Sequence, residues 1–335
     1  MSSARAELTW RSPGLLALYV LVFCGIAVSF LAGAYPLGPS AVMGFLFAQD
    51  LPATDATVAS LRAVRIIGAL SVGAALAISG LLLQSLTRNE LAEPGLLGIS
   101  SGAGLAVVLY TALFPGELTL LSSTGAAIVG AVVSGTMAFA LAGGFSSVGA
   151  SKTRLILSGA VLALLFAALT TTVLSLDTNT LGDTRVWLAG SLADRPPNVV
   201  VPLGVIILIV ALLAWAYSGR FTILSMGDET ATGLGIDPLQ TRVLSLLFAL
   251  CFAGLAVAIA GPIGFVGLIA PHVARSIVGG RLTMCLPVAV LVGAALLLFS
   301  DAIVRILAPP AEAPVGVATL LIGAPFFLLI LRRGA

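Results

Sequence analysis

Apolar windows long enough to cross a membrane recur along almost the whole chain. A helix of about 20 residues spans the hydrocarbon core of a bilayer, which is roughly 30 Å thick. Only 9% of the 335 residues are charged, whereas a soluble domain has roughly 25%. The windows leave no room for a separate soluble domain. The pattern therefore predicts an all-α polytopic membrane protein in which residues 1–335 form one transmembrane domain.

Counting the windows predicts ten membrane spans. The first follows Arg5 and Arg11, and we interpret it as a retained span because it is too long for the apolar core of a signal peptide. The apolar run over 243–270 is too long for one untilted span. The sequence "GPIG" at 261–264 divides it in two, since proline removes a helix donor and glycine relaxes the backbone. The ten windows lie near residues 14–34, 64–86, 95–114, 119–143, 154–176, 198–218, 241–260, 263–279, 286–307 and 314–332.

The distribution of basic residues supports this count. With ten spans and a cytoplasmic N-terminus, eleven of the sixteen basic residues fall on the cytoplasmic side, as basic residues near spans usually do. Treating 243–270 as one span would put Arg332 and Arg333 on the face opposite the N-terminus. We therefore predict that both termini are cytoplasmic. The basic residues left outside are Arg62, Arg65, Arg185, Arg195 and Arg305.

Several kinds of chemistry are excluded by the residue types present. His272 is the only histidine, which excludes metal sites built on paired histidines. No GxxxxGK[ST] phosphate loop occurs, so the chain cannot consume ATP by itself. Cys24, Cys251 and Cys285 have no CxxC spacing and are interpreted as small buried hydrophobes. We predict no catalytic site, no metal site, no covalently bound cofactor and no nucleic-acid partner.

The placement of carboxylates argues against two other classes of membrane protein. An ion-coupled secondary transporter would hold acidic residues at mid-membrane, and a membrane enzyme would cluster His, Asp or Cys at one face. Here the carboxylates lie in loops and at span ends. Asp301 is the exception, but Arg305 follows four residues later on the same helical face. We expect a local ion pair there, near the external end of the span.

One acidic stretch punctuated by glycine, "SMGDETATGLGID" at 225–237, separates two apolar runs. Asp228 and Glu229 suit a helix N-terminus, and Gly233 and Gly235 permit a turn into a second short helix. The predicted topology puts the stretch in the cytoplasm. A membrane protein without an energy source of its own could receive energy there from another chain.

Five stretches together resemble a known family, the FecCD-type permeases. These are the transmembrane subunits of ABC importers for iron-siderophores, haem and cobalamin. The resemblance covers about residues 62–333, with the stretches in order and at the family's spacing. They are "RAVRIIGALSVGAALAISGLLLQSLTRNELAEPGLLGISSGAG", "RVWLAGSL", "GDETATGLGI", "AGPIGFVGLIAPHVAR" and "PVGVATLLIGAPFFLLILRR".

The resemblance implies the type II ABC importer permease fold and a multi-subunit assembly in a bacterial cytoplasmic membrane. Two permease subunits surround a central pathway, two cytoplasmic ATPases use the ATP, and an extracytoplasmic binding protein delivers the substrate. Siderophore systems often use two different permeases, so we expect a paralogous heterodimer, with a homodimer as the alternative. The stretch at 183–195 favours a ferric siderophore as cargo, with haem or cobalamin as the alternative.

Family positions on the external side can be carried over individually. Arg62, Arg65 and Arg305 match arginines that grip carboxylates of the binding protein, and the competing interpretation is interfacial snorkelling. The external segment is expected at about 177–197. Its residues that match the pathway lining are Trp187, Gly190 and Ser191.

The resemblance also assigns residues on the cytoplasmic side. Asn89, Leu91 and Thr153 match a gate, although this chain departs from the family pattern at Glu90, where proline is usual, and at Lys152. We expect a structural role for His272, since a lone histidine near a helix end is more often structural than a ligand. The loop that couples the permease to its ATPase is expected at about 219–240. Its matching residues are Gly227, Asp228, Glu229, Ala231, Gly233, Leu234 and Gly235.

Overall fold

The computed structural model describes residues 13–95, 97–114, 120–144, 152–176, 187–307 and 313–334. Within these ranges the protein is helical and contains no strand, which confirms the all-α prediction. The helices are α1 (Pro13–Leu31), α2 (Pro39–Leu46), α3 (Ala53–Thr87), α4 (Ile99–Leu113), α5 (Leu120–Leu141), α6 (Lys152–Leu176), α8 (Pro197–Met226), α9 (Asp228–Gly233), α10 (Pro238–Ala260), α11 (Val266–Val278), α12 (Leu282–Leu307) and α13 (Val315–Gly334).

Each predicted window coincides with a helix. Seven helices in the described part of the chain, α1, α3, α5, α6, α8, α10 and α12, are long and apolar enough to cross a membrane. The windows near 95–114, 263–279 and 314–332 hold the shorter apolar helices α4, α11 and α13. At 1.5 Å per residue, the 13 residues of α11 rise only about 20 Å, which is less than the hydrocarbon core. Helix length therefore supports seven spans, and the count of ten stays a prediction.

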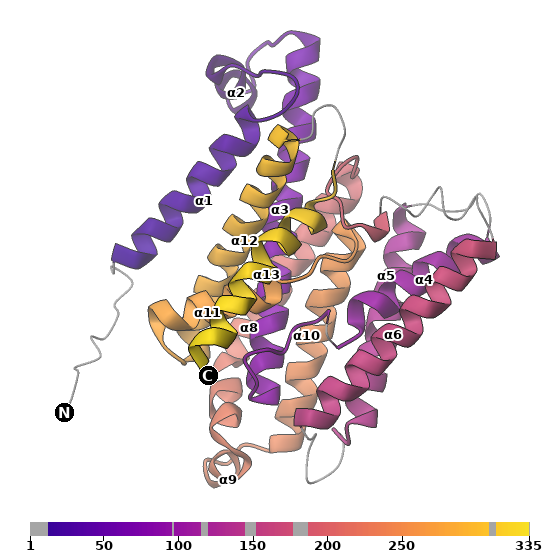
Figure 1. Cartoon of the computed structure of the whole chain (residues 1–335). Coiled ribbons are helices and arrows are strands. Elements are labelled where there is room, and N and C mark those ends of the chain that lie inside the picture. Colours follow the sequence, from indigo (N-terminus) through magenta and orange to yellow (C-terminus); the bar gives the residue numbers. More distant parts are fainter. Residues whose placement is uncertain are drawn as a thin grey trace.

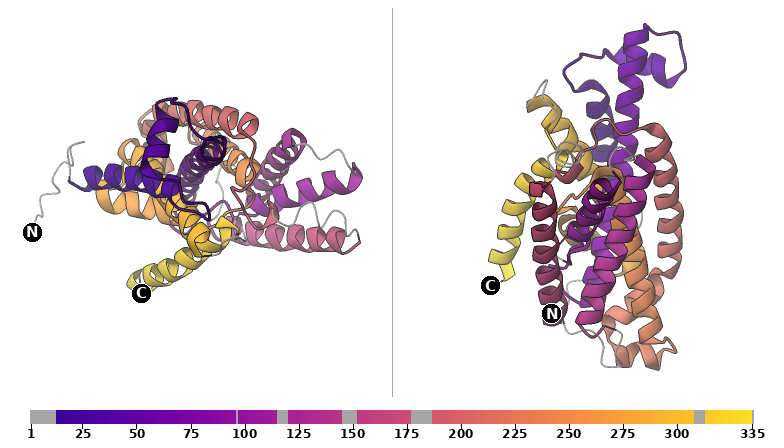
Figure 2. Two further views of the ribbon diagram at one scale, coloured as in Figure 1. Left: turned by 90° about the horizontal axis from the view of Figure 1, so that it is seen from above. Right: turned by 90° about the vertical axis from the view of Figure 1, so that its right-hand side faces the viewer.

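The two ends of the helix bundle carry different elements. The short helix α2 and the start of α3 project at one end, and α9 lies at the opposite end, as two perpendicular views show (Figures 1 and 2). The sequence did not predict α2, and α3 begins at Ala53, well before the expected start at residue 64. Both lie outside the apolar window, so hydropathy alone could not place them.

Helix α3 is the central element, and it packs against α8, α10, α11 and α12. Glycines allow this close packing: a Cβ at Gly73 would lie 2.4 Å from the carbonyl oxygen of Gly293 on α12. A Cβ at Gly80 would lie only 1.9 Å from the carbonyl oxygen of Gly267 on α11. Because lipid tails are as apolar as the helices, such backbone approach contributes much of the packing energy in a membrane.

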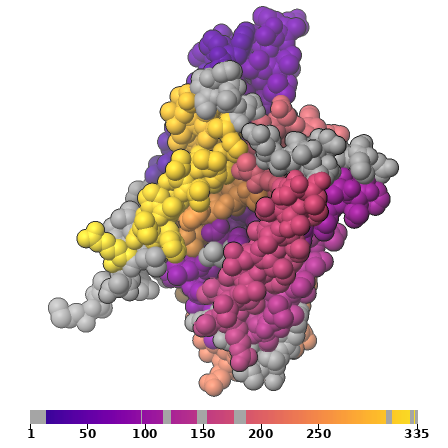
Figure 3. Space-filling model, turned by 45° about the vertical axis from the view of Figure 1, so that its right-hand side comes forward, coloured from indigo at the N-terminus to yellow at the C-terminus, as the bar shows by residue number. Residues whose placement is uncertain are grey.

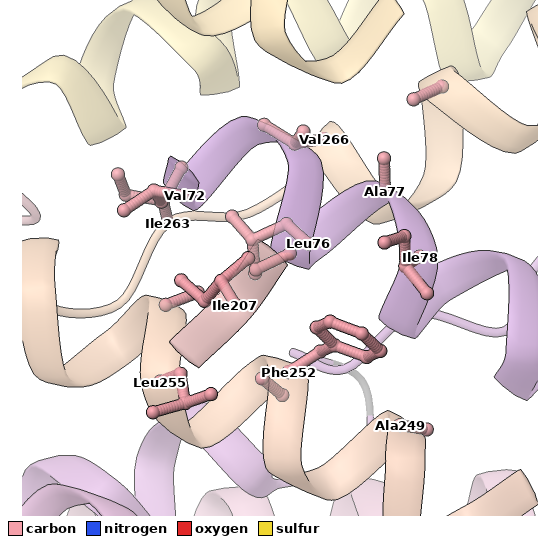
Figure 4. Close-up of a cluster of buried hydrophobic side chains, with 14 of the residues drawn as sticks. Val72, Leu76, Ala77, Ile78, Ile207, Ala249, Phe252, Leu255, Ile263 and Val266 are labelled. Carbon is pink, nitrogen blue, oxygen red and sulfur yellow. The ribbon is translucent and has the colours of Figure 1, made fainter. Parts of the chain in front are cut away.

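Large apolar side chains fill the remaining space around α3. Val72 and Leu76 of α3 lie beside Ile207 of α8 and Phe252 and Leu255 of α10 in the buried cluster (Figure 4). All five side chains are at most 5% exposed. This core holds α3 and α10 in fixed positions, and near α9 the helix α3 ends and the helix α10 begins.

Candidate functional site

The acidic stretch at the end of α8 forms the short helix that the sequence predicted. Asp228 and Glu229 occupy the first turn of α9, and Gly227 and Gly235 adopt positive φ angles of 133° and 76° on either side of it. The second short helix is not present. The chain instead enters α10 directly, because the side chain of Asp237 accepts hydrogen bonds of 2.8 and 3.2 Å from two backbone N–H groups of its first turn.

Asp228 is bonded within the protein. One carboxylate oxygen accepts a hydrogen bond of 3.0 Å from Arg88, the residue that ends α3, and the other accepts one from Arg242 of α10. Arg88 also donates to the carbonyl oxygen of Leu224 at 3.1 Å. Asp228 therefore ties α9 to the ends of α3 and α10.

The rest of α9 presents a surface. Ala231 is fully buried and anchors the short helix, whereas Glu229, Gly233, Leu234 and Gly235 are exposed. Leu234 is 62% exposed, although it is a large apolar side chain in a polar turn. Met226 and Leu239, which flank α9 in the chain, are also exposed, at 68% and 40%, and these apolar side chains together make this end of the molecule a candidate protein contact.

We call residues 88–98 the gate segment, after the gate role predicted for Asn89 and Leu91; Leu96 within it lies outside the described residues. Arg88 has a left-handed φ of 49°, which ends α3. Asn89 follows in a local turn in which its side-chain oxygen accepts from Leu91 N–H at 3.0 Å and its backbone carbonyl accepts from Ala92 N–H at 3.1 Å. Thr153, the third expected gate residue, is exposed in the first turn of α6, and no hydrogen bond within the described ranges joins it to Asn89 or Leu91.

Sequence reasoning missed Glu93, a buried carboxylate in the gate segment. It is 7% exposed, and its Oε1 accepts a hydrogen bond of 2.8 Å from the backbone N–H of Phe265. Burial raises the pKa of the Glu93 carboxyl to about 7, and the hydrogen bond from Phe265 opposes that shift. The sequence "LAEPGLLG" gave a signal for this residue, because it places a glutamate within an apolar run. Glutamate is seldom buried without a partner, so its position there indicates a partner elsewhere in the chain.

Glu90 and His272 also connect the gate segment to α11. The Nδ1 atom of His272 lies 3.8 Å from a carboxylate oxygen of Glu90, and the His272 ring meets the Phe326 ring edge-on, with centroids 5.9 Å apart. The side chain of Lys152, the other departure from the family pattern, lies outside what the structure describes.

At the opposite end, the expected Asp301–Arg305 ion pair is confirmed and includes a third residue. Arg305 Nε lies 3.0 Å from one oxygen of Asp301, and Arg65 Nη2 lies 2.9 Å from the other. Asp301 is 2% exposed. Arg305 also donates to the carbonyl oxygens of Ser29 and Ala32 at 3.0 and 2.9 Å, which joins α12 to the end of α1.

Arg62 is buried as well. Its guanidinium donates to the carbonyl oxygens of Phe30 and Tyr35 at 2.5 and 2.6 Å, and the residue is 6% exposed. The side chain therefore turns into the protein and does not reach along a lipid interface. We call Arg62, Arg65, Arg305 and Asp301 the outer cluster; it holds three guanidiniums and one carboxylate.

The expected pathway residues lie within the helix packing. Trp187 is 7% exposed and Ser191 is 1% exposed. Ser191 N–H donates to the carbonyl oxygen of Ala260 at 2.8 Å, and the carbonyl oxygen of Gly190 accepts from Gly316 N–H at 3.0 Å. These bonds connect the end of α10 to the start of α13. The remainder of the external segment, residues 177–186, lies outside the described residues, and a pathway role for these residues stays a prediction.

Comparisons with known proteins cover nearly the whole chain. The sequence model of the FecCD transport family matches residues 20–333. The ferric enterobactin transport system permease protein FepD of Escherichia coli (strain K12) is 38% identical over 322 residues, which are 96% of this chain and 94% of that protein. The Fe(3+)-citrate import system permease protein YfmD of Bacillus subtilis (strain 168) is 35% identical over 320 residues, with coverage of 96% and 94%.

Two further similarities concern haem and the fold. The hemin transport system permease protein HmuU of Yersinia pestis is 39% identical over 279 residues, which are 82% of this chain and 83% of that protein. A solved structure of a metal-chelate type ABC transporter in an inward-facing conformation matches with a TM-score of 0.80 and 30% identity, covering 95% of this chain and 98% of that chain. The residues that the family model matches include α9, the gate segment and the outer cluster.

Proposed function

The chain belongs to the FecCD transport family, and on that basis we propose that it is the permease subunit of an ATP-driven importer that carries a ferric siderophore across the bacterial cytoplasmic membrane. The observation that carries the proposal is the match over residues 20–333 together with relatives named for iron chelates. Haem is the second candidate cargo, because the hemin permease of Yersinia pestis is similar at 39% identity. Cobalamin remains the alternative that the family as a whole allows.

The geometry of α9 supports a partner ATPase on the cytoplasmic side. The exposed surface around Leu234 lies at the end of the molecule opposite α2 (Figure 1). Asp228 fixes this surface to α3 and α10, so a push on it would reach both helices. We assign residues 227–235 to the contact with one of two ATPase subunits.

We propose ten spans for this chain, and a second permease subunit would complete the type II arrangement around a central pathway. Helix α6 is only 17% buried along its apolar window, and a hollow separates it from α13 on one face (Figure 3). Apolar faces of this size require lipid or a protein partner. We assign this face to a paralogous second subunit, with the pathway along the hollow, Asn89, Leu91 and Thr153 as its cytoplasmic gate, and both termini in the cytoplasm.

Uptake in proteoliposomes tests the proposed function. The permease, its partner permease, the ATPases and the binding protein are reconstituted together. They are supplied with ferric enterobactin, ferric citrate or hemin labelled with radioiron, or with cobalamin labelled with radiocobalt. We expect ATP-dependent accumulation of a ferric siderophore. Uptake that persists without ATP and follows an ion gradient would contradict the proposal and favour a secondary transporter.

The outer cluster leads to a prediction about the binding protein. Within the outer cluster three guanidiniums lie against one carboxylate, and this local excess of positive charge would attract carboxylates on a docking protein. We expect docking to weaken as salt rises from about 0.05 to 0.5 M, because salt screens the attraction between the outer cluster and carboxylates of the approaching protein. Arg62→Gln should reduce that salt dependence, whereas Arg220→Gln, on the cytoplasmic side in the proposed topology, serves as the control. Salt-independent affinity would remove the docking role.

A further inference from the structure

A buried carboxylate connects the gate segment to the start of α11. Glu93 accepts from Phe265 N–H at 2.8 Å, and Phe265 is the N-cap residue of α11, with a left-handed φ of 68°. The first N–H groups of a helix have no partner within that helix, and they favour a nearby negative charge. Phe265 has no side-chain oxygen that could serve as the cap. Glu93, from another part of the chain, therefore pairs the backbone N–H of the N-cap residue itself, which has no acceptor within α11.

The backbone around this bond is tightly packed. A Cβ at Gly267, in the first turn of α11, would lie 3.0 Å from Pro94 and 3.0 Å from the carbonyl oxygen of Leu76 on α3. The start of α11 is thus held between α3 and the Glu93–Pro94 dipeptide. Displacing the gate segment relative to α11 would leave the Glu93 carboxyl and the Phe265 N–H unpaired in a buried site, which is costly.

The gate residues lie close to this attachment in the chain. Asn89 and Leu91 form their turn two to four residues before Glu93, and Leu97 N–H donates to the Glu93 carbonyl at 3.3 Å. A second contact, between Glu90 and His272 at 3.8 Å, reaches α11 one to two turns further along. Of the two contacts, the one at Glu93 is better shielded from solvent, because Glu93 is 7% exposed whereas the Glu90 side chain is 65% exposed.

We propose that Glu93 is a positioning residue that attaches the gate segment to α11, so that the gate and α11 move as one unit during transport. The inference rests on the proposed function of the chain as an importer permease. It predicts that the hydrogen-bond acceptor at position 93 determines how well ATP hydrolysis is coupled to transport. A cap that serves stability alone would leave coupling unchanged.

The test compares substitutions of similar size in the complete reconstituted importer. Glu93→Gln keeps an oxygen that can accept from Phe265 N–H, and Glu93→Met fills the site without one. We measure radioiron transported per ATP hydrolysed, with the ferric chelate that the wild-type importer takes up, and we record thermal stability in parallel. Disulfide formation between cysteines at position 89 and at its counterpart in the second permease reports the gate position.

We expect Glu93→Gln to transport within about twofold of wild type and Glu93→Met to lose about tenfold in transport per ATP, the scale of one buried hydrogen bond. Basal hydrolysis should persist in Glu93→Met, and its gate cysteines should crosslink less completely. Glu93→Asp, whose side chain is one methylene shorter, should give a transport per ATP between those of the other two variants. If Glu93→Met does not assemble, Glu93→Asp serves as the test variant in its place.

Wild-type coupling for both Glu93→Met and Glu93→Asp would overturn the inference. Equal loss in Glu93→Gln and Glu93→Met would also overturn it, since the acceptor would then not be what matters. A wild-type importer that moves none of the tested chelates would instead contradict the proposed function, so the two failures are distinguishable.

Discussion

Replacing Leu234 with Asp is expected to abolish ATP-driven uptake while the permease still folds. Leu234 is 62% exposed at the tip of the α9 turn, so a charge there costs the isolated permease little. In the assembled importer the same side chain would be buried against the ATPase, where loss of a central apolar contact costs about 2 kcal/mol or more. The measurements are co-purification of the ATPase with the permease and substrate-stimulated ATP hydrolysis.

Two variants on the same element separate partner contact from internal structure. Glu229→Gln removes one exposed charge from the assigned contact and should weaken ATPase assembly much less than Leu234→Asp does. Asp228→Asn weakens the bonds to Arg88 and Arg242, so it should preserve assembly but lower transport per ATP. Normal ATPase binding and uptake in the Leu234→Asp variant would remove α9 from the coupling contact.

Replacing Asp301 with Ala is expected to destabilise the permease strongly. Asp301 is 2% exposed, and its carboxylate lies 2.9 Å from Arg65 and 3.0 Å from Arg305. Without this carboxylate, two buried guanidiniums lose their shared negative partner. Breaking a buried ion pair from one side typically costs about 3–5 kcal/mol. Thermal unfolding in detergent should show a large fall in midpoint, and α1, which Arg305 holds through two carbonyl oxygens, should become accessible to protease.

Two comparisons make the Asp301 result specific. Asp301→Asn retains an acceptor of the same shape and should lose less stability than the alanine variant. Adding Arg65→Met to Asp301→Ala should restore part of the loss, because one buried charge is removed together with its partner. If the alanine variant unfolds at the wild-type midpoint, the outer cluster does not stabilise the fold.

The structure gives different environments to residues for which the sequence predicted the same role. Asp228 and Glu229 both suit the first turn of a short helix, yet only Glu229 faces outward, since Asp228 is bonded to Arg88 and Arg242. Arg62 was expected at the surface, either to dock a partner or to snorkel, but its guanidinium is buried against two backbone carbonyls. A sequence pattern predicts which helix a residue belongs to. It predicts which face of the helix the side chain occupies only when the residues it contacts are near in the chain.

What the sequence determined by itself is local: the apolar windows, the start of α9 at Asp228, and the ion pair between Asp301 and Arg305, four residues apart. These follow from helix periodicity and hydropathy, which act over one or two turns. Only the tertiary structure decided which side chains meet across the bundle. Arg88 and Asp228 are 140 residues apart, Glu93 and Phe265 are 172 apart, and Arg65 and Asp301 are 236 apart. The pairs of Glu93 and Asp301 form because helix packing buries these carboxylates, which must then find partners wherever in the chain those partners lie.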